Sequence, residues 1–389
     1  MNRSPVSDRL HTGDRFTAHR SAFHAALLST IYVTLFYPSF KLRPPLSQRH
    51  ILHFICTQGI FSFHRLRFYL SFLIFADYNI TCSSELMSPQ NFTHLLAQTV
   101  TELSSGPSLK GLFHEHQDGD PIPSGKVLYE IIQLCRAILF PGFYGKSTVN
   151  HHTITYHTGV NIERLYNLLS EQIQAGLCFS AEPEEGHTGY RPCEAYKEKA
   201  CQLAARFISR LPHIRSILAT DVEAAYNGDP AAETYGEIIS CYPIIKALSN
   251  YRIAHELMLA GVPLIPRIIT EMAHSETGID IHPGAQIGHH FTIDHGTGVV
   301  IGATCIIGNH VKLYQGVTLG AKSFPLDEEG NPIKGIPRHP ILEDHVIVYA
   351  NSTILGRITI GKGATIGGNI WVTEDVPAGA RLVQKKPTK

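Results

Sequence analysis

The chain has 389 residues, of which 43% are hydrophobic and 17% charged, so it can build a sizeable core and is not disordered throughout. Its 33 Lys and Arg balance 33 Asp and Glu, which argues against a protein that binds nucleic acid or a membrane surface through bulk charge. Eight scattered cysteines without a CxxC pair argue against a disulfide framework or a zinc ribbon, and no apolar run reaches the roughly 18 residues of a membrane span.

Residues 1–86 differ in composition from the rest of the chain. From Arg15 to Ala76 the only charged residues are basic, and no helical or alternating period holds. Met87 opens a sequence of ordinary composition. We interpret residues 1–86 as an over-extended start; a targeting region is the first alternative, since transit peptides are basic and poor in acids, and a small domain is the second.

Residues 87–278 are predicted to form one helical domain. Apolar residues recur every three or four positions in Val160–Ala175 and again in Ala195–Leu211, where Pro212 is expected to end the helix. Further helices are predicted in Ile214–Tyr226 and Gly236–Leu259, with a surface connection at Glu182–Cys193.

From residue 279 to 383 the period changes to six. Twelve hexads begin with Ile, Leu or Val, and a loop at 320–341 interrupts them. The first positions of these hexads are Ile281, Ile287, Ile293, Ile301, Ile307, Leu313, Leu342, Val348, Ile354, Ile360, Ile366 and Val372. Such a repeat predicts a prism of short strands, three hexads per turn, whose aliphatic first residues stack inside. A β-sandwich with accidental spacing is the alternative.

Polar motifs interrupt this coil where the repeat does not need them. They are Asp280-Ile-His-Pro, Asp294-His295-Gly-Thr-Gly and Arg338-His339-Pro, and a fourth polar motif, Asp229-Pro-Ala, stands in the helical part. With these motifs, and with the runs Gly228–Ala231, Asn250–His255 and Leu313–Gly320, the chain resembles the serine O-acetyltransferases, which are hexapeptide-repeat acyltransferases. The resemblance implies an N-terminal helical domain, a left-handed parallel β-helix, a short tail at 384–389, and a homotrimer or dimer of trimers.

The same resemblance implies which residues perform catalysis. Acetyl transfer to serine needs a base for the hydroxyl, and imidazole, with an ordinary pKa near 6.5, suits that role. His295 is expected to be this base, and Asp280 the carboxylate that orients it. His339 is expected to donate a hydrogen bond to the substrate or the developing oxyanion. Cys305 falls at an inward position and is expected to belong to the core.

Substrate contacts follow from the resemblance as well. Arg338 is expected to bind the serine carboxylate, and Asp229 and Asp294 its ammonium group. Acetyl-CoA is expected to lie between two coils near Gly320, Ala350 and Lys362. No metal is expected.

Three other functions are alternatives. One is acetyl transfer to a sugar or amino-sugar hydroxyl, against which the Asp-Pro-Ala turn of the helical domain argues. A zinc hydratase of the γ-carbonic anhydrase type needs a histidine set that the chain does not match, because Gln315 stands five residues after His310. The third is a scaffold for O-acetylserine sulfhydrylase; the chain lacks the family's terminal isoleucine, which argues against that complex. The expected location is the cytoplasm.

Overall fold

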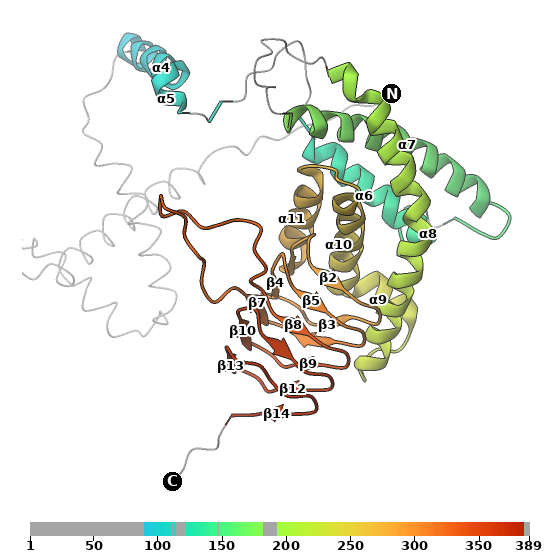
Figure 1. The fold of residues 1–389 in the computed structure, drawn as a ribbon. Helices are drawn as coiled ribbons and strands as arrows, with labels where there is room; N and C mark the ends of the chain where they lie inside the picture. The colour runs from blue at the N-terminus through green and yellow to red at the C-terminus, as the bar shows by residue number, and fades with distance from the viewer. Residues whose placement is uncertain (1–88, 111, 114–121, 147, 182–192, 385–389) are drawn as a thin grey trace, which may run out of the picture. The chain divides into compact units, whose positions relative to one another are not determined.

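We describe the protein from a computed structural model, which covers residues 89–110, 112–113, 122–146, 148–181 and 193–384 (Figure 1). The interpretations of residues 1–86 and of the connection at 182–192 lie outside these residues. The chain divides into two compact units, residues 1–113 and 114–389. In the first, the described elements are helices α4 (Pro89–Ser104) and α5 (Gly106–Leu109). None of the helices described in either unit combines the length and apolarity of a membrane span.

Six α-helices are described in the second unit, and they pack around a shared apolar core. They are α6 (Gly125–Leu139), α7 (Ile154–Phe179), α8 (Lys197–Gly228), α9 (Tyr235–Cys241), α10 (Pro243–Leu259) and α11 (Ile265–Thr277). The predicted apolar stripe of Val160–Ala175 lies within α7, where Leu165, Leu169 and Ile173 are fully buried. The three- and four-residue spacing thus marks the face that packs inward.

Helix α8 does not end where the sequence predicted. It continues through Pro212 to Gly228, so the predicted stop was wrong. Proline in a helix interior costs about 3 kcal/mol, because it removes a hydrogen bond and crowds the preceding turn. The apolar stripe continues on both sides, with Leu211, Ile214 and Leu218 buried, and this burial offsets the cost.

The described part of the chain contains a disulfide that the cysteine spacing did not predict. Cys178, near the end of α7, is bonded to Cys193 at the start of the short 3₁₀ helix η1 (Cys193–Tyr196). The bond holds the segment that leads into α8 beside the end of α7. Among the other described cysteines, 135, 201, 241 and 305 are free.

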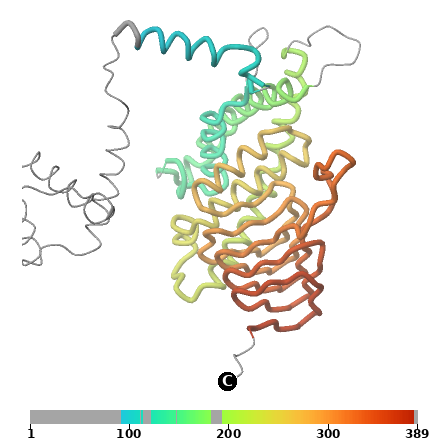
Figure 2. The backbone as a smooth tube through the Cα atoms, turned by 90° about the vertical axis from the view of Figure 1, so that its left-hand side faces the viewer, coloured from blue at the N-terminus to red at the C-terminus, as the bar shows by residue number. Residues whose placement is uncertain are grey.

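The hexads form a left-handed parallel β-helix, as predicted. Its fourteen described strands are β1 (Asp280–Ile281), β2 (Gln286–Ile287), β3 (Thr292–Asp294), β4 (Val300–Ile301), β5 (Ile306–Ile307), β6 (Lys312–Tyr314), β7 (Thr318–Gly320), β8 (Ile341–Leu342), β9 (Ile347–Val348), β10 (Thr353–Leu355), β11 (Thr359–Ile360), β12 (Thr365–Ile366), β13 (Trp371–Val372) and β14 (Arg381–Leu382). They pair in parallel into three sheets, ordered β1-β4-β7-β10-β13, β11-β8-β5-β2 and β14-β12-β9-β6-β3. Figure 2 shows the coils stacked one upon another below the helices.

All twelve predicted first positions are buried, from fully buried Val348 to 9% exposed Ile287. The strand register places aliphatic residues of successive coils side by side: Ile281 pairs with Ile301, and Ile301 with Leu319. Leu319, fully buried in β7, is a further core residue beyond the twelve predicted first positions.

A buried polar network joins the helices to the first coil. Arg252 of α10 pairs with Asp221 of α8 and donates to the carbonyl oxygens of Ile287 and Gly288, at 2.5 and 2.7 Å. The hydroxyl of Tyr251 donates to Ala285 O at 2.6 Å. Burial raises the pKa of Asp221 to about 6 although Arg252 opposes the shift. These contacts give the Asn250–His255 motif a structural role.

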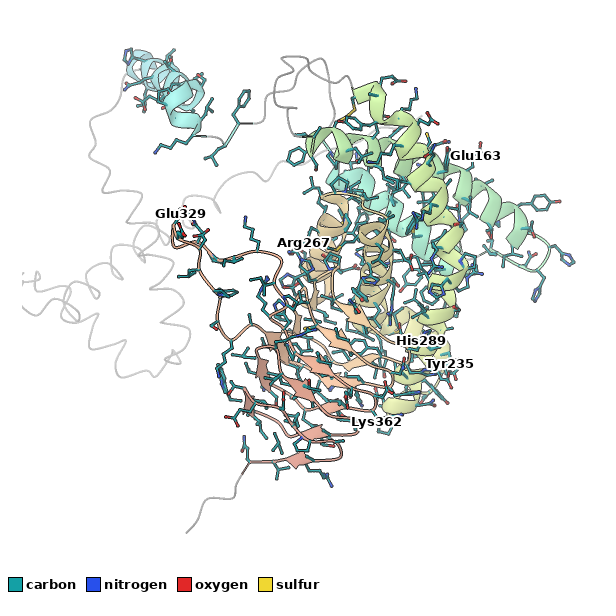
Figure 3. The ribbon with its side chains drawn as sticks, viewed as in Figure 1. Glu163, Tyr235, Arg267, His289, Glu329 and Lys362 are labelled. Carbon is teal, nitrogen blue, oxygen red and sulfur yellow. A yellow bond between two sulfur atoms is a disulfide. The ribbon has the colours of Figure 1, made fainter. Side chains whose placement is uncertain are left out.

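The predicted loop at 320–341 forms an exposed arm. Leu326 and Pro332 pair in an antiparallel bridge, and Glu329 lies at the tip, away from the coil (Figure 3). Phe324, Leu326 and Ile333 are more than 40% exposed on the single chain.

Replacing Pro212 by Ala tests the account of α8. The variant restores a backbone donor inside a helix, so we expect its free energy of unfolding to rise by about 1–3 kcal/mol. The matched control is Pro243→Ala, since Pro243 is the first residue of α10, where proline is compatible with the helix. Urea denaturation measures both; a Pro212→Ala variant no more stable than the control would contradict the account.

Candidate active site

The turn between β3 and β4 carries the predicted base. We call this edge of the prism, with its equivalents on the next coils, the His295 corner. His295 sits there with a φ of 59°, and its side chain is 75% exposed on the single chain. Asp294 closes β3, and its Oδ1 lies 3.8 Å from His295 Nε2. That distance permits an ion pair when the imidazole is protonated but is too long for a hydrogen bond.

Asp229 approaches this corner from the helical part. It follows the last residue of α8, and its carboxylate accepts hydrogen bonds from the Tyr242 hydroxyl at 2.5 Å and from Ala231 N at 2.8 Å. The Tyr242 hydrogen bond, and then the Ala231 bond, hold the pKa of Asp229 below its ordinary value. The carboxylate is therefore ionised and fixed, as an ammonium-binding group must be.

Two further residues belong to this cluster, and the sequence reading missed both. Tyr242 orients Asp229, as described. Lys312 of β6 places its Nζ 3.3 Å from Asp294 Oδ2 and donates to Gly228 O at 2.6 Å. Neither stands in a motif that singled it out: Tyr242 lies between two helices, and Lys312 occupies a variable hexad position.

Asp280 lies close to this corner without touching the base. It is the first residue of β1 and pairs in register with Val300, the first residue of β4, which directly follows the His295 turn. No hydrogen bond or ion pair joins its carboxylate to His295 in the described part of the chain. The orienting role of Asp280 therefore stays a prediction.

The second group of predicted residues lies on another edge. We call the edge between the β1 and β2 sheets the His339 corner. His339 is 7% exposed there, and its imidazole packs against Gly302. A Cβ at residue 302 would lie 2.1 Å from His339 Cδ2, so only glycine leaves room for the ring.

Thr304 fixes the proton on His339. Thr304 N donates to His339 Nδ1 at 3.1 Å. Its hydroxyl oxygen accepts from Arg338 N and His339 N, which leaves the hydroxyl hydrogen to donate to Nδ1 at 2.8 Å. Because Nδ1 accepts, the neutral ring carries its proton on Nε2. Nothing in the sequence pattern identified Thr304.

His339 is also kept neutral. Burial, followed by the charges of Arg338 and Arg357, lowers its pKa to about 4. On the same corner, burial and then Arg267 lower the pKa of His282 to about 4. A neutral His339 is a hydrogen-bond donor rather than a cation.

Arg338 adds a cation beside this donor. Its guanidinium lies over the Phe324 ring, with Cζ 5.9 Å from the centroid, and its buried Nε has no partner. Arg338 forms no ion pair with any described residue, so its guanidinium is suited to bind a carboxylate.

The structure does not bring the two groups together on one chain. The sheet β1-β4-β7-β10-β13 separates the His295 corner from the His339 corner, and its strands of two or three residues span roughly 10 Å. His339 cannot swing across, because Thr304 and Gly302 hold it in place.

The predicted acetyl-CoA residues are likewise dispersed. Gly320 ends β7, Ala350 lies on the His295 corner, and Lys362 lies on the third edge, where it is 63% exposed (Figure 3). Lys362 Nζ is 3.9 Å from Asp344 Oδ2. The single chain therefore does not gather these three residues in one groove.

The third edge carries a stack of histidines. The rings of His290, His310 and His345 lie one above another, with centroids 4.2 and 4.8 Å apart. They come from successive coils and form a ladder. No cluster of three His, Cys, Asp or Glu residues suited to a metal occurs in the described ranges.

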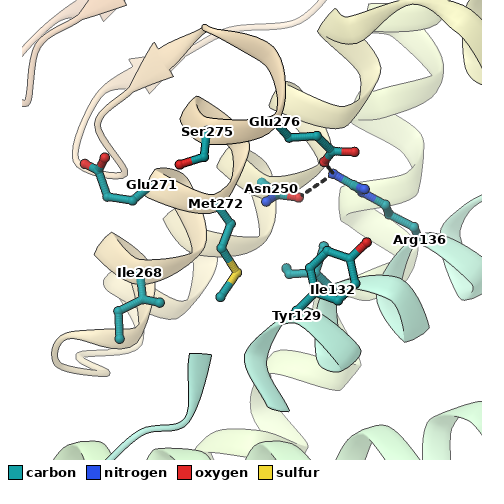
Figure 4. A pocket seen from close by; sticks show the side chains of 9 residues that line it. All are labelled: Tyr129, Ile132, Arg136, Asn250, Ile268, Glu271, Met272, Ser275 and Glu276. Carbon is teal, nitrogen blue, oxygen red and sulfur yellow. Dashed lines mark hydrogen bonds and ion pairs between the residues drawn. The ribbon is translucent and has the colours of Figure 1, made fainter. Parts of the chain in front are cut away.

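Two cavities among the described residues lie away from the predicted site residues. The cavity of about 520 Å³ lies between α6, α10 and α11, where buried Arg136 pairs with Glu276 and Asn250 (Figure 4). The other, of about 800 Å³, lies between α10 and the β2 sheet.

Cys305 is fully buried, and burial raises the pKa of its thiol to about 12, as expected of a core residue rather than a nucleophile.

Comparisons with known proteins address the resemblance directly. No family model matches the chain. A plasmid-borne serine acetyltransferase of Synechococcus elongatus is 50% identical over 264 residues, covering 68% of this chain and 82% of the relative. A serine acetyltransferase of Bacillus licheniformis is 44% identical over 167 residues, covering 43% of this chain and 73% of that protein.

Solved structures agree in fold. Entamoeba histolytica serine acetyltransferase 1, in complex with L-cysteine, superposes with a TM-score of 0.56 at 33% identity, covering 75% of this chain and 96% of that one. Isoform 3 from the same organism gives 0.56 at 32% identity, covering 77% and 93%. The fold and its polar corners define a hexapeptide-repeat acyltransferase. Within that class, the chain belongs to the serine acetyltransferase family.

The state of His339 can be measured by histidine-selective NMR. We expect its imidazole to titrate near pH 4, with the proton of the neutral ring on Nε2. The signal is assigned by its loss in His339→Gln. As pH falls from about 6.5 to 4, the unfolded chain takes up this proton before the folded one, so His339 lowers folding stability across that window. A midpoint near 6.5 would contradict the burial argument.

Proposed function

We propose that this chain transfers the acetyl group of acetyl-CoA to the hydroxyl of L-serine, giving O-acetyl-L-serine and CoA. The observation that carries the proposal is the gathering of two carboxylates, Asp229 and Asp294, near an accessible imidazole, His295. Carboxylates bind the serine ammonium, and the imidazole removes a proton from its hydroxyl.

The reaction needs no covalent enzyme intermediate. His295 takes the hydroxyl proton while the serine oxygen bonds to the thioester carbonyl carbon. The tetrahedral oxyanion then collapses, the carbon–sulfur bond breaks, and the sulfur takes the proton back from the imidazolium as free CoA leaves. Asp280, near the corner, is proposed to stabilise the imidazolium.

The His339 corner is proposed to supply two further groups that this step needs, a donor for the oxyanion and a cation for the serine carboxylate. A neutral His339 with its proton on Nε2 donates to the developing oxyanion, for which a preorganised donor is most effective. Arg338, without a competing carboxylate in the described chain, binds the serine carboxylate. Acetyl-CoA is proposed to contact Gly320, Ala350 and Lys362.

We propose that these two corners meet between subunits of a homotrimer. Two observations support this: His295 is 75% exposed on the single chain, and His339 is held on a different edge. Packing the His295 corner of one prism against the His339 corner of the next would complete three equivalent sites by rotation. A dimer of trimers, a cytoplasmic location and a complex with O-acetylserine sulfhydrylase stay predictions.

The base is tested by replacing His295 with Ala. Thiol release from acetyl-CoA is measured with and without serine, and we expect the serine-dependent rate to fall at least about a hundredfold. The matched control is His289→Ala, an exposed histidine on the third edge, which should keep the parental rate. An alanine variant at 295 that is as active as the parent would remove His295 from the mechanism.

The shared site is tested by complementation. His295→Ala and His339→Ala chains are denatured, mixed and refolded together. If each site takes one histidine from each of two subunits, about a quarter of the sites in random trimers contain both, and activity returns to about that fraction. A site formed within one chain would regain nothing. Each variant refolded alone serves as the control.

A further inference from the structure

We propose that Lys312 is a positioning residue for the serine site: it sets the orientation of Asp294 and ties the segment that carries Asp229 to the coil. The inference rests on the proposed function and adds to it a cation that binds neither substrate. It follows from the contacts of a single ammonium group at the junction between α8 and β6.

The Lys312 ammonium is engaged on three sides. It donates to Gly228 O at 2.6 Å, lies 3.3 Å from Asp294 Oδ2, and stands 4.6 Å from the centroid of the Tyr314 ring. Its side chain is 17% exposed. A lysine this buried needs its charge compensated, and here a carboxylate, a carbonyl and an aromatic face do so.

Asp294 is oriented by this contact. Lys312 occupies Oδ2, and the other oxygen, Oδ1, is the one that lies 3.8 Å from His295 Nε2. Without the ammonium the carboxylate could rotate about its terminal torsion, which has a broad energy profile. Lys312 therefore acts on the base through Asp294.

Asp229 is positioned through its backbone. Gly228 is the last residue of α8, and Asp229 follows it in an extended conformation. A lysine bonded to the final carbonyl also complements the negative end of the helix dipole. The hydrogen bond from Lys312 to Gly228 O fixes the position of the backbone where α8 ends and the Asp229 turn begins. Tyr242 fixes the carboxylate of Asp229 itself.

The charges of the cluster also balance around the substrate. Asp229 and Asp294 would repel each other, and Lys312 cancels one of the two negative charges. One net negative charge remains to match one ammonium group on the amino acid. The groups that face Lys312 come from α8, β3 and β6, and Tyr349 supports Tyr314 from the next coil, with ring centroids 4.9 Å apart.

The test compares Lys312→Met with Lys312→Arg in the full chain. Methionine keeps much of the volume and removes the charge, so we expect the KM for serine to rise about tenfold, the scale of one charged hydrogen bond. The KM for acetyl-CoA should stay within about twofold of the parental value. Arginine keeps the cation and should restore much of the serine affinity.

Lys246→Met is the matched control, because Lys246 is another partly exposed lysine that pairs with a carboxylate, Glu276, at 2.7 Å. It should leave the KM for serine unchanged. Serine binding is measured independently by calorimetry, and thermal unfolding is recorded for every variant.

The outcomes separate the two proposals. A parent that does not acetylate serine refutes the proposed function, and this inference falls with it. An active parent with a Lys312→Met variant of parental KM for serine refutes the inference alone. Equal loss in Lys312→Met and Lys312→Arg, or a lower melting temperature without a change in the KM for serine, shows a purely structural lysine and also refutes it.

Discussion

The buried side chain of Arg252 joins the helical part of this protein to its coil. It pairs with Asp221 of α8 while donating to two carbonyl oxygens of the first coil, Ile287 O and Gly288 O. Removing either charge would leave the other buried and unpaired, which is costly. Because Asp229 belongs to the helical part and Asp294 to the coil, the proposed serine site requires this junction to hold.

The coil places its chemistry at its edges for a simple reason. Parallel pairing between successive coils uses the backbone groups of each strand, and the aliphatic first residues fill the inside of the prism. Polar side chains are left at the turns, such as His295 at one edge and His339 at another. Because these edges are separate on one chain, the proposed site requires the edges of two chains to meet.

Much of the architecture could be read from the sequence, because a six-residue period has few physical explanations and all twelve predicted aliphatic positions are buried. The reading was wrong at Pro212, since local helix-breaking tendency yields to burial of the apolar stripe on both sides. It also missed the disulfide between Cys178 and Cys193, which depends on how the ends of α7 and η1 meet. Motifs pointed to His295 and His339, whereas Thr304, Tyr242 and Lys312 carry no local signal.

The sequence by itself determined the repeat, the inward residues and the chemical types at each corner, because period and side-chain chemistry are local properties. Only the tertiary structure decided which groups meet. Thr304 sets the tautomer of His339 across a gap of 35 residues, and Lys312 reaches Gly228 across 84. Contacts over such separations depend on the register of the coils and on the docking of α8 against β3, which no single segment encodes.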